Sequence, residues 1–286
     1  MDKIAIDIGG TFMRVALFHN EQMIKMVKER TPKTKREFIK ELVCLIHEVK
    51  DSQKIKGIGI GIPGPADYKK GVIINPPNLP LRNINLKKIL QKKIKTKIIF
   101  ENDARCVALA EKYFGVKRAN FLVITLGTGV GGGIIVNNEL CTGNGNAGEI
   151  GHMILQYLPH KRKNHEINNP GSFELLASGE AMRKKAKMLL GQPLTAKQLK
   201  DSARRGNKKA QQILEETTLY LAIGISNLIH IFNPEIIVLS GGVKEAGDYF
   251  LDKVKSKLET LNSTKTKIIW TRMDEPGLLG ASTLIK

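Results

Sequence analysis

Three glycine-rich turns constrain the fold of this chain more than any other feature. Each follows a short apolar run typical of a buried strand; they read Asp7-Ile8-Gly9-Gly10-Thr11, Leu126-Gly127-Thr128-Gly129 and Leu239-Ser240-Gly241-Gly242. Because glycine has no Cβ, the backbone N–H groups of such turns can approach phosphate oxygens closely. Neither the P-loop spacing nor the dinucleotide fingerprint is met, since the turn at 127–132 leads into another strand. This disfavours both of those motifs, and each turn taken singly could be an ordinary hairpin between strands.

The first two turns have the same surroundings. Residues 3–8 and 14–18 have strand character on either side of the first turn, and residues 121–126 and 131–136 repeat this arrangement around the second. Helical patterns at 35–50, 104–113 and 207–232 alternate with further strands, which predicts an α/β fold. The repeat predicts two lobes around a central cleft, where ligands commonly lie. We expect residues 1–104 with about 275–286 to form a small N-terminal lobe, and residues 105–274 a large C-terminal lobe.

The net charge of +19 raises the question of a nucleic-acid partner. In residues 86–97, however, apolar side chains recur at helical spacing and lysines occupy most of the remaining positions, which is typical of a solvated helix face. No aromatic residues interleave with the basic runs, although such residues usually provide the stacking platforms for bases. We therefore expect no specific nucleic-acid partner.

Composition also bears on the compartment. The three cysteines (Cys44, Cys106 and Cys141) are scattered along the chain, which predicts free thiols instead of a disulfide framework or a metal cluster. No apolar run approaches the ~20 residues of a membrane span. No basic and apolar signal segment precedes the first strand. These features predict a cytoplasmic protein without a membrane partner.

Eight stretches carry a resemblance to a known family. In chain order they are IAIDIGGTFMRVALF, GIGIPGP, NPPNLP, ENDARCVALAEKYFG, ITLGTGVGGGIIV, GNAGEIGH, ELLASG and NPEIIVLSGGV. They resemble the actin-like ATPase superfamily, whose fold is ribonuclease-H-like and bilobal. Within it they resemble the ROK family of sugar kinases and sugar-responsive repressors. The resemblance runs from Ile4 to beyond Val243 and implies ATP, Mg²⁺ and a hexose as ligands.

Asp103 matches the catalytic aspartate of that family. Taken alone, an Asn-Asp pair at a strand end is most often a turn or a helix cap. The resemblance instead implies that the Asp103 carboxylate accepts the proton of the sugar hydroxyl as that oxygen attacks phosphorus, a role that typically contributes ~10²–10⁴-fold to the rate. Asn102 beside it would orient a neighbouring sugar hydroxyl.

The resemblance implies two further sets of residues. The sugar-binding set consists of Gly64, Asn78, Asn102, Asp103, Glu149, His152 and Glu174. The nucleotide-binding set consists of Asp7, Gly9, Gly10, Thr11, Gly127, Thr128, Gly129, Gly241 and Gly242, with Asp7 holding Mg²⁺ or its water ligands. Two of the sugar-side residues have structural alternatives, because Asn78 could be an ordinary turn residue and His152 a buried structural histidine.

One part of the chain departs from the family. Many members carry a zinc site beside the sugar pocket, formed by the counterpart of His152 and three cysteines in the pattern C-x-C-G-x-x-G-C-x-E. The cysteine positions here hold His165, Ile167 and Ser172. Isoleucine cannot bind zinc and serine is a poor ligand, although His152, His160 and His165 could in principle form a three-histidine site. We predict no structural zinc, which leaves the loop at 157–170 to be held by packing.

Other functions remain open at this stage. A sugar-responsive repressor of the family would carry a helix-turn-helix module before the first phosphate strand, which here begins at Ile4. A non-catalytic binder would lack the base, whereas Asp103 is present. We therefore expect a glucokinase or hexokinase that phosphorylates the 6-hydroxyl of glucose, with mannose, fructose, allose, glucosamine and N-acetylated hexosamines as alternatives. The resemblance also implies a homodimer.

Overall fold

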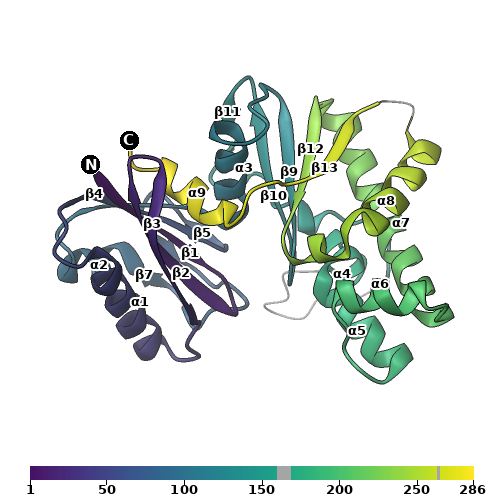
Figure 1. The fold of residues 1–286 in the computed structure, drawn as a ribbon, viewed down its shortest axis with the longest axis horizontal. Coiled ribbons are helices and arrows are strands. Elements are labelled where there is room, and N and C mark those ends of the chain that lie inside the picture. The colour runs from purple at the N-terminus through teal and green to yellow at the C-terminus, as the bar shows by residue number, and fades with distance from the viewer. Residues whose placement is uncertain (160–168, 263–264) are drawn as a thin grey trace. The chain divides into compact units, whose positions relative to one another are not determined.

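The computed structural model describes residues 1–159, 169–262 and 265–286, and the chain folds as two compact units (Figure 1). The first unit contains Met1–Lys117, Leu140–Ala147 and Arg272–Lys286, and the second contains Arg118–Glu139 and Gly148–Thr271. The boundary expected after residue 104 falls inside helix α3 (Asp103–Tyr113), which lies wholly in the first unit.

The first unit is built on a five-stranded sheet with the order β3-β2-β1-β4-β8. Strand β2 runs antiparallel to its neighbours β1 and β3, whereas β1, β4 and β8 are parallel. The strands are β1 (Asp2–Ile8), β2 (Phe12–His19), β3 (Gln22–Arg30), β4 (Ile55–Ile62) and β8 (Lys97–Asn102). A second, three-stranded sheet contains β5 (Ala66–Asp67), β6 (Val72–Ile73) and β7 (Ile84–Asn85).

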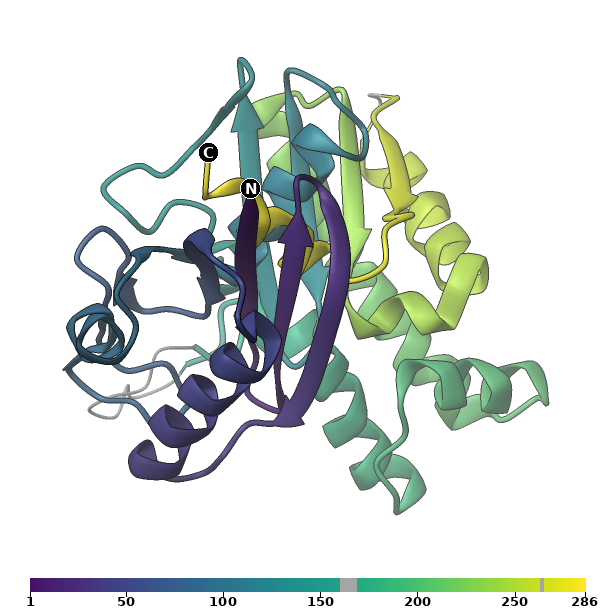
Figure 2. The ribbon, with the colours of Figure 1, turned by 60° about the vertical axis from the view of Figure 1, so that its left-hand side comes forward.

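Helix α1 (Lys35–Lys50) covers the antiparallel part of the five-stranded sheet, as Figure 2 shows. It begins where the Thr34 side chain accepts a hydrogen bond from the backbone N–H of Glu37 at 3.3 Å. Its apolar residues recur at helical spacing and are buried with the strands in one hydrophobic core. Helix α2 (Leu86–Lys93) is shorter than the pattern predicted, because the buried Ile94 adopts an extended backbone that leads the chain towards β8.

The C-terminal segment returns to the first unit as α9 (Pro276–Thr283). Its Leu278 and Ala281 are fully buried against Ala5, Phe18 and Cys106, which belong to β1, β2 and α3. This packing explains why α3 belongs to the first unit, since one side of the helix is buried under α9.

The second unit repeats the strand order of the first. Its sheet runs β11-β10-β9-β12-β13, with β9 and β10 antiparallel and β9, β12 and β13 parallel. The strands are β9 (Phe121–Leu126), β10 (Val130–Val136), β11 (Glu139–Leu140), β12 (Ile236–Ser240) and β13 (Lys267–Trp270). The helices are α4 (Phe173–Ala177), α5 (Gly179–Leu190), α6 (Ala196–Arg204), α7 (Lys208–Phe232) and α8 (Gly247–Leu261), with 3₁₀ turns η1 (Ile150–His152) and η2 (Gly242–Ala246). The predicted α/β fold built from two similar halves is confirmed.

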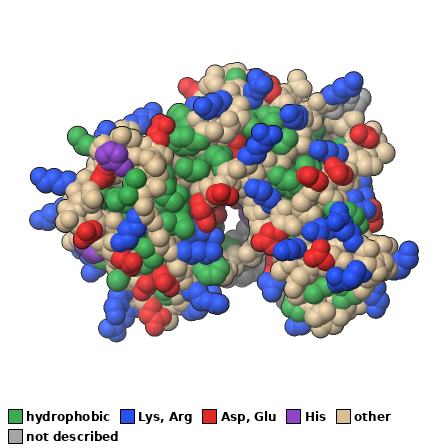
Figure 3. Space-filling view, in the orientation of Figure 1, with side chains coloured by type: hydrophobic (Ala, Val, Ile, Leu, Met, Phe, Trp, Pro, Cys, Tyr) green, Lys and Arg blue, Asp and Glu red, His purple; other side chains and the backbone are tan. Residues whose placement is uncertain are grey.

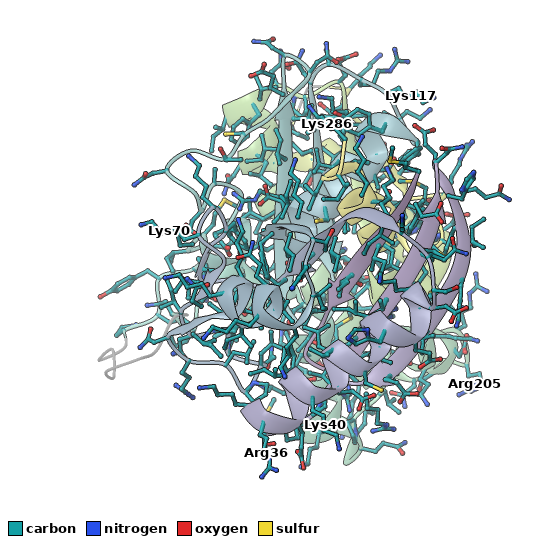
Figure 4. The ribbon with its side chains drawn as sticks, turned by 90° about the vertical axis from the view of Figure 1, so that its left-hand side faces the viewer. Arg36, Lys40, Lys70, Lys117, Arg205 and Lys286 are labelled. Atoms are coloured by element: carbon teal, nitrogen blue, oxygen red, sulfur yellow. The ribbon has the colours of Figure 1, made fainter. Side chains whose placement is uncertain are left out.

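On one face of the molecule, the basic side chains are spread out instead of being gathered in one place (Figure 3). On the face shown in Figure 3, Lys and Arg side chains alternate with acidic and uncharged ones over both units. In Figure 4, the labelled Arg36 and Lys40 extend outward from α1, as expected for the solvated face of an amphipathic helix. Within the described ranges, no helix is long and apolar enough to cross a membrane.

Candidate active site

The first glycine turn joins β1 to β2 in the first unit. The backbone N–H of Gly9 donates to the carbonyl of Phe12 at 2.9 Å, and the Thr31 hydroxyl donates to the carbonyl of Gly9 at 2.6 Å. A Cβ at Gly10 would lie 2.6 Å from Cβ of Asn78. The turn predicted to bind phosphate therefore touches the loop predicted to bind sugar, with the Thr11 side chain exposed beside it.

Asp7 lies near the end of β1, close to Arg14 and Glu275, two side chains of opposite charge that were not predicted from the sequence. Nη1 of Arg14 is 3.3 Å from the Asp7 carboxylate, and Nε of Arg14 is 2.9 Å from the carboxylate of Glu275. Burial raises the pKa of Asp7 to about 6; Arg14 opposes this shift and Glu275 adds to it. A divalent cation would offset the same burial cost, and Mg²⁺ commonly binds through one or two carboxylates together with phosphate oxygens. Asp7 therefore fits the role predicted for it.

Asp103 is the first residue of α3, immediately after β8. Its Oδ1 accepts a hydrogen bond from the backbone N–H of Ala104 at 2.9 Å, and the side chain of Asn102 caps the helix by accepting from the N–H of Arg105 at 3.1 Å. Strand β4 runs parallel to β8 and ends at Ile62, opposite Asn102; Gly64 follows two residues later. Four of the predicted sugar-side residues (Gly64, Asn78, Asn102 and Asp103) thus belong to the first unit.

The Asn102 amide is engaged at both ends. Besides capping α3 with its oxygen, it donates from Nδ2 to the hydroxyl of Tyr68 at 3.2 Å, and its side chain is buried. Asn102 was predicted to bind sugar, and the structure adds a structural role that holds the amide in one orientation.

The second glycine turn, in the second unit, is fixed from two sides. The carbonyl of Gly127 accepts from the N–H of Gly179 at 2.8 Å, at the start of α5. Oε2 of Glu174 accepts from the N–H of Val130 at 3.0 Å and also lies where a Cβ at Gly129 would be. Glu174, predicted on the sugar side, is therefore attached to the nucleotide turn, where the side chain of Thr128 is exposed.

The third glycine turn adjoins the second. Gly241 has φ of 93°, a conformation that favours glycine, and a Cβ there would collide with the carbonyl of Leu126. A Cβ at Gly242 or at Gly127 would meet no protein atom within 4 Å. The two turns thus pack on each other while Gly127 and Gly242 leave space in which a ligand could approach.

Glu149 and His152 lie at the two ends of the short turn η1. Oε2 of Glu149 is 3.7 Å from Nε2 of His152, and the two side chains are 40% and 39% exposed. The structure therefore brings these two predicted sugar-binding residues together at the surface of the second unit.

The segments on either side of the divergent loop are joined by backbone hydrogen bonds. The N–H of Leu155 donates to the carbonyl of Gly171 at 2.9 Å, and the N–H of Phe173 donates to the carbonyl of Met153 at 2.8 Å. The hydroxyl of Tyr220 in α7 adds a hydrogen bond to Gln156 at 2.8 Å. We call residues 153–156 and 169–173, paired in this way, the clasp.

The residues at the family's zinc positions do not fit a zinc site. Ser172 is fully buried and caps α4, with Oγ accepting from the N–H of Leu175 at 3.5 Å. His160, His165 and Ile167 lie outside the described residues, and isoleucine has no ligand atom. Among the residues that are described, no group of three or more His, Cys, Asp or Glu side chains could hold a metal.

Sequence reasoning missed four residues around the site: Arg14, Glu275, Tyr68 and Arg105. Arg105 is 2% exposed and pairs with Glu101 through Nη2 at 2.6 Å. Glu101 lies in β8 and Arg105 in α3, so the pair joins a strand to the next helix and the i,i+4 spacing rule for helices could not have predicted it. Nothing in the sequence marked Tyr68 or Glu275, because their partners are distant along the chain.

Comparisons with known proteins identify the family of this chain. The chain is 32% identical to a glucokinase of Thermotoga maritima, over 99% of this chain and 96% of the relative. It is 29% identical to a xylose repressor of Caldicellulosiruptor bescii, over 88% of this chain and 68% of the repressor. A ROK family glucokinase from Streptomyces griseus, solved in complex with glucose and AMPPNP, superimposes with a TM-score of 0.85 at 26% identity, covering 100% of this chain and 99% of that one. The ROK family model matches residues 3–286, so the chain belongs to the ROK family.

Proposed function

We propose that this chain is an ATP-dependent sugar kinase that phosphorylates the 6-hydroxyl of glucose or a related hexose. The prediction of a sugar kinase is confirmed by the full-length likeness to proteins named as glucokinases, one of them solved with glucose and AMPPNP. The observation that carries the catalytic proposal is the place of Asp103, at the junction of β8 and α3 with its carboxylate oriented by the first turn of the helix.

Asp103 acts as the general base in this proposal. The oxygen of the sugar hydroxyl attacks the γ-phosphorus of ATP while the bond from phosphorus to the bridging oxygen of ADP breaks. The hydroxyl proton passes to the Asp103 carboxylate, so the products are a sugar phosphate, ADP and a proton. Removal of such a base typically costs ~10²–10⁴-fold in rate.

The other sugar-side residues bind and orient. Carboxylates accept hydrogen bonds from hydroxyl groups in fixed directions, which suits Glu149 and Glu174. His152 and the amides of Asn78 and Asn102 can either donate or accept such hydrogen bonds. Gly64 would leave room for the ring beside the end of β4. A missing hydrogen bond at one ring carbon changes selectivity strongly, so these residues would decide among hexoses.

The nucleotide-side residues hold the phosphates and the adenosine. The turns at 9–11 and 127–129 would donate backbone N–H groups to phosphate oxygens, and Gly241 and Gly242 would leave space for the adenosine. Asp7 would hold Mg²⁺ directly or through water. The ion, when bound, offsets negative charge on the phosphates.

The deciding experiment is a screen of ADP release by the purified protein against glucose, mannose, fructose, allose, glucosamine and N-acetylglucosamine, with Mg²⁺ present. The proposal expects glucose or a close relative to be turned over, and no turnover by Asp103→Asn. Binding of sugar without turnover by the wild type would instead favour a sugar-responsive regulator, the activity named for the xylose repressor relative.

Three finer points complete the proposal. The protein works with Mg²⁺, as a homodimer and in the cytoplasm. Sedimentation of the purified chain tests the dimer, since a monomer mass at micromolar concentration would contradict it. Omitting Mg²⁺ from the screen tests the metal requirement, and locating the chain by cell fractionation tests the compartment.

A further inference from the structure

Arg105 is a buried cation two residues after the proposed base. Its side chain is 2% exposed, although arginine is almost never fully buried unless it is paired. Nη2 lies 2.6 Å from Oε1 of Glu101 at the end of β8, and Nη1 donates to the carbonyl of Gly145 at 2.8 Å. Arg105 therefore joins the strand that leads to Asp103 to the segment Leu140–Ala147, which belongs to the same unit.

The guanidinium of Arg105 also stacks on an aromatic ring. Its central carbon is 4.8 Å from the centroid of the Tyr68 ring, and Tyr68 is 8% exposed. The Tyr68 hydroxyl accepts from Nδ2 of Asn102, and Oδ1 of Asn102 accepts from the backbone N–H of Arg105. Arg105, Tyr68 and Asn102 therefore each contact the other two, and these contacts hold both the oxygen and the nitrogen of the Asn102 amide in place.

A contribution to stability does not by itself explain why a guanidinium group is buried at this position. Taking a charge out of water is costly, and an apolar side chain of similar volume often stabilises a protein as well or better. What an apolar side chain could not do is bind a carboxylate, a carbonyl and a ring face at once, which requires the planar fork of arginine. Lysine could keep the ion pair with Glu101 but could not reproduce the geometry of all three contacts.

We infer that Arg105, supported by Tyr68, is a positioning residue for phosphoryl transfer. It fixes the Asn102 amide and the first turn of α3, from which Asp103 projects. Through Gly145 it also holds the chain four residues before Glu149. Its side chain contacts Glu101, Tyr68 and Gly145, and none of these belongs to the predicted nucleotide-binding set. We therefore expect it to act on sugar binding and on the chemical step and not on ATP binding. This inference rests on the proposed function.

The test compares Arg105→Lys and Tyr68→Phe with a matched control, Arg204→Lys. Arg204, in α6, also stacks on a tyrosine, with its guanidinium carbon 5.2 Å from the centroid of Tyr249, and neither residue is among the predicted site residues. We expect kcat/KM for the hexose to fall by about 10- to 100-fold in Arg105→Lys, because a displacement near 1 Å can cost ~10²-fold. Tyr68→Phe, which removes one hydroxyl, should lose about 3- to 10-fold. The KM for ATP should stay within about twofold in both, and Arg204→Lys should match the wild type.

Hydrogen exchange of the same proteins separates the inference from the proposed function. Arg105→Lys should raise exchange in peptides covering 101–106 and 141–147, but not in peptides from β9 and β10. An unchanged 141–147 peptide, or an equal rise in the KM for ATP and for the sugar, would overturn the inference. If the wild type phosphorylates no hexose, the proposed function fails, and the exchange data alone decide whether Arg105 holds these two segments together.

Discussion

Oε2 of Glu174 accepts a hydrogen bond from the backbone N–H of Val130 at 3.0 Å, directly after the turn at 127–129. Glu174 is the second residue of the short helix α4, and this helix is followed by Ser178, which caps α5. A residue predicted to bind sugar therefore also supports the turn predicted to bind nucleotide. Within the second unit, the two functions share one carboxylate.

Glu174→Ala tests this shared role. Loss of a hydrogen bond to a charged acceptor removes roughly 1.5–3 kcal/mol, so we expect the KM for ATP and the KM for the sugar each to rise about tenfold or more. Glu174→Gln keeps an acceptor oxygen for Val130 and should change the KM for ATP much less. The partly exposed Glu180, paired with Arg183 on α5, supplies the control Glu180→Gln. A rise confined to the sugar would contradict the role at the turn.

Gly241 and Gly242 form a matched pair of neighbouring glycines. Alanine at 241 meets a positive φ and the carbonyl of Leu126, which costs on the order of 1–3 kcal/mol in strain and lowers the melting temperature by several degrees. Alanine at 242 meets no protein atom within 4 Å, so the melting temperature should not change. The KM for ATP should nevertheless rise in Gly242→Ala, because the methyl group enters the space proposed for the nucleotide. An unchanged KM would place the nucleotide elsewhere.

Much of the fold could be predicted because its signals are local. The helical pattern at 35–50 matches α1, and the pattern at 207–232 ends with α7 at Phe232, where Asn233-Pro234 follows. The junction of β8 and α3, which places Asp103, was also visible, since a strand pattern runs directly into Asn102 as a helix cap. These features depend on neighbours in sequence, which is why one sequence was sufficient.

The rest depends on partners that are far apart in the chain. A charged residue in a helical pattern is most often solvated, so Arg105 gave no sign that Tyr68 and Gly145 would bury it. Arg14 forms ion pairs with both Asp7 and Glu275, although Glu275 is far from the other two residues in the sequence. The clasp likewise pairs residues on either side of a long loop. The placement of α3 in the first unit depends in the same way on its packing against α9, which is not encoded in the pattern of either helix.

Asp7 predicts a specific pH dependence of stability. Its pKa is raised by burial from 3.8 to about 6, so the unfolded chain releases this proton at a lower pH than the folded one. The stabilisation from protonated Asp7 is complete below pH 3.8 and is lost as pH rises through about 6, a change on the order of 3 kcal/mol. The free energy of unfolding of the wild type, minus that of Asp7→Asn, should therefore fall between pH 4 and pH 7 in buffer without Mg²⁺. The exposed Asp252→Asn serves as control, and a difference that rises with pH would contradict the assignment.

Because backbone hydrogen bonds join the two segments of the clasp, we expect zinc chelators to have no effect on stability or on sugar binding. Treatment with 1,10-phenanthroline, assayed with Mg²⁺ present, should leave the melting temperature and the sugar KM unchanged. Ser172→Ala removes the cap of α4 and should cost about 0.5–2 kcal/mol. A loss of stability with the chelator, restored by added zinc, would show that a metal holds the loop after all.

The central claim is that Asp103 accepts the proton of the sugar hydroxyl. Asp103→Asn keeps an oxygen for the N–H of Ala104 and the cap formed by Asn102, so folding should be preserved. The most direct measurement is kcat of this variant on the best hexose of the panel, beside its melting temperature and its KM for ATP. We expect kcat to fall by about 10²–10⁴-fold, with the melting temperature and KM for ATP close to those of the wild type. Turnover by Asp103→Asn near the wild-type rate would contradict it.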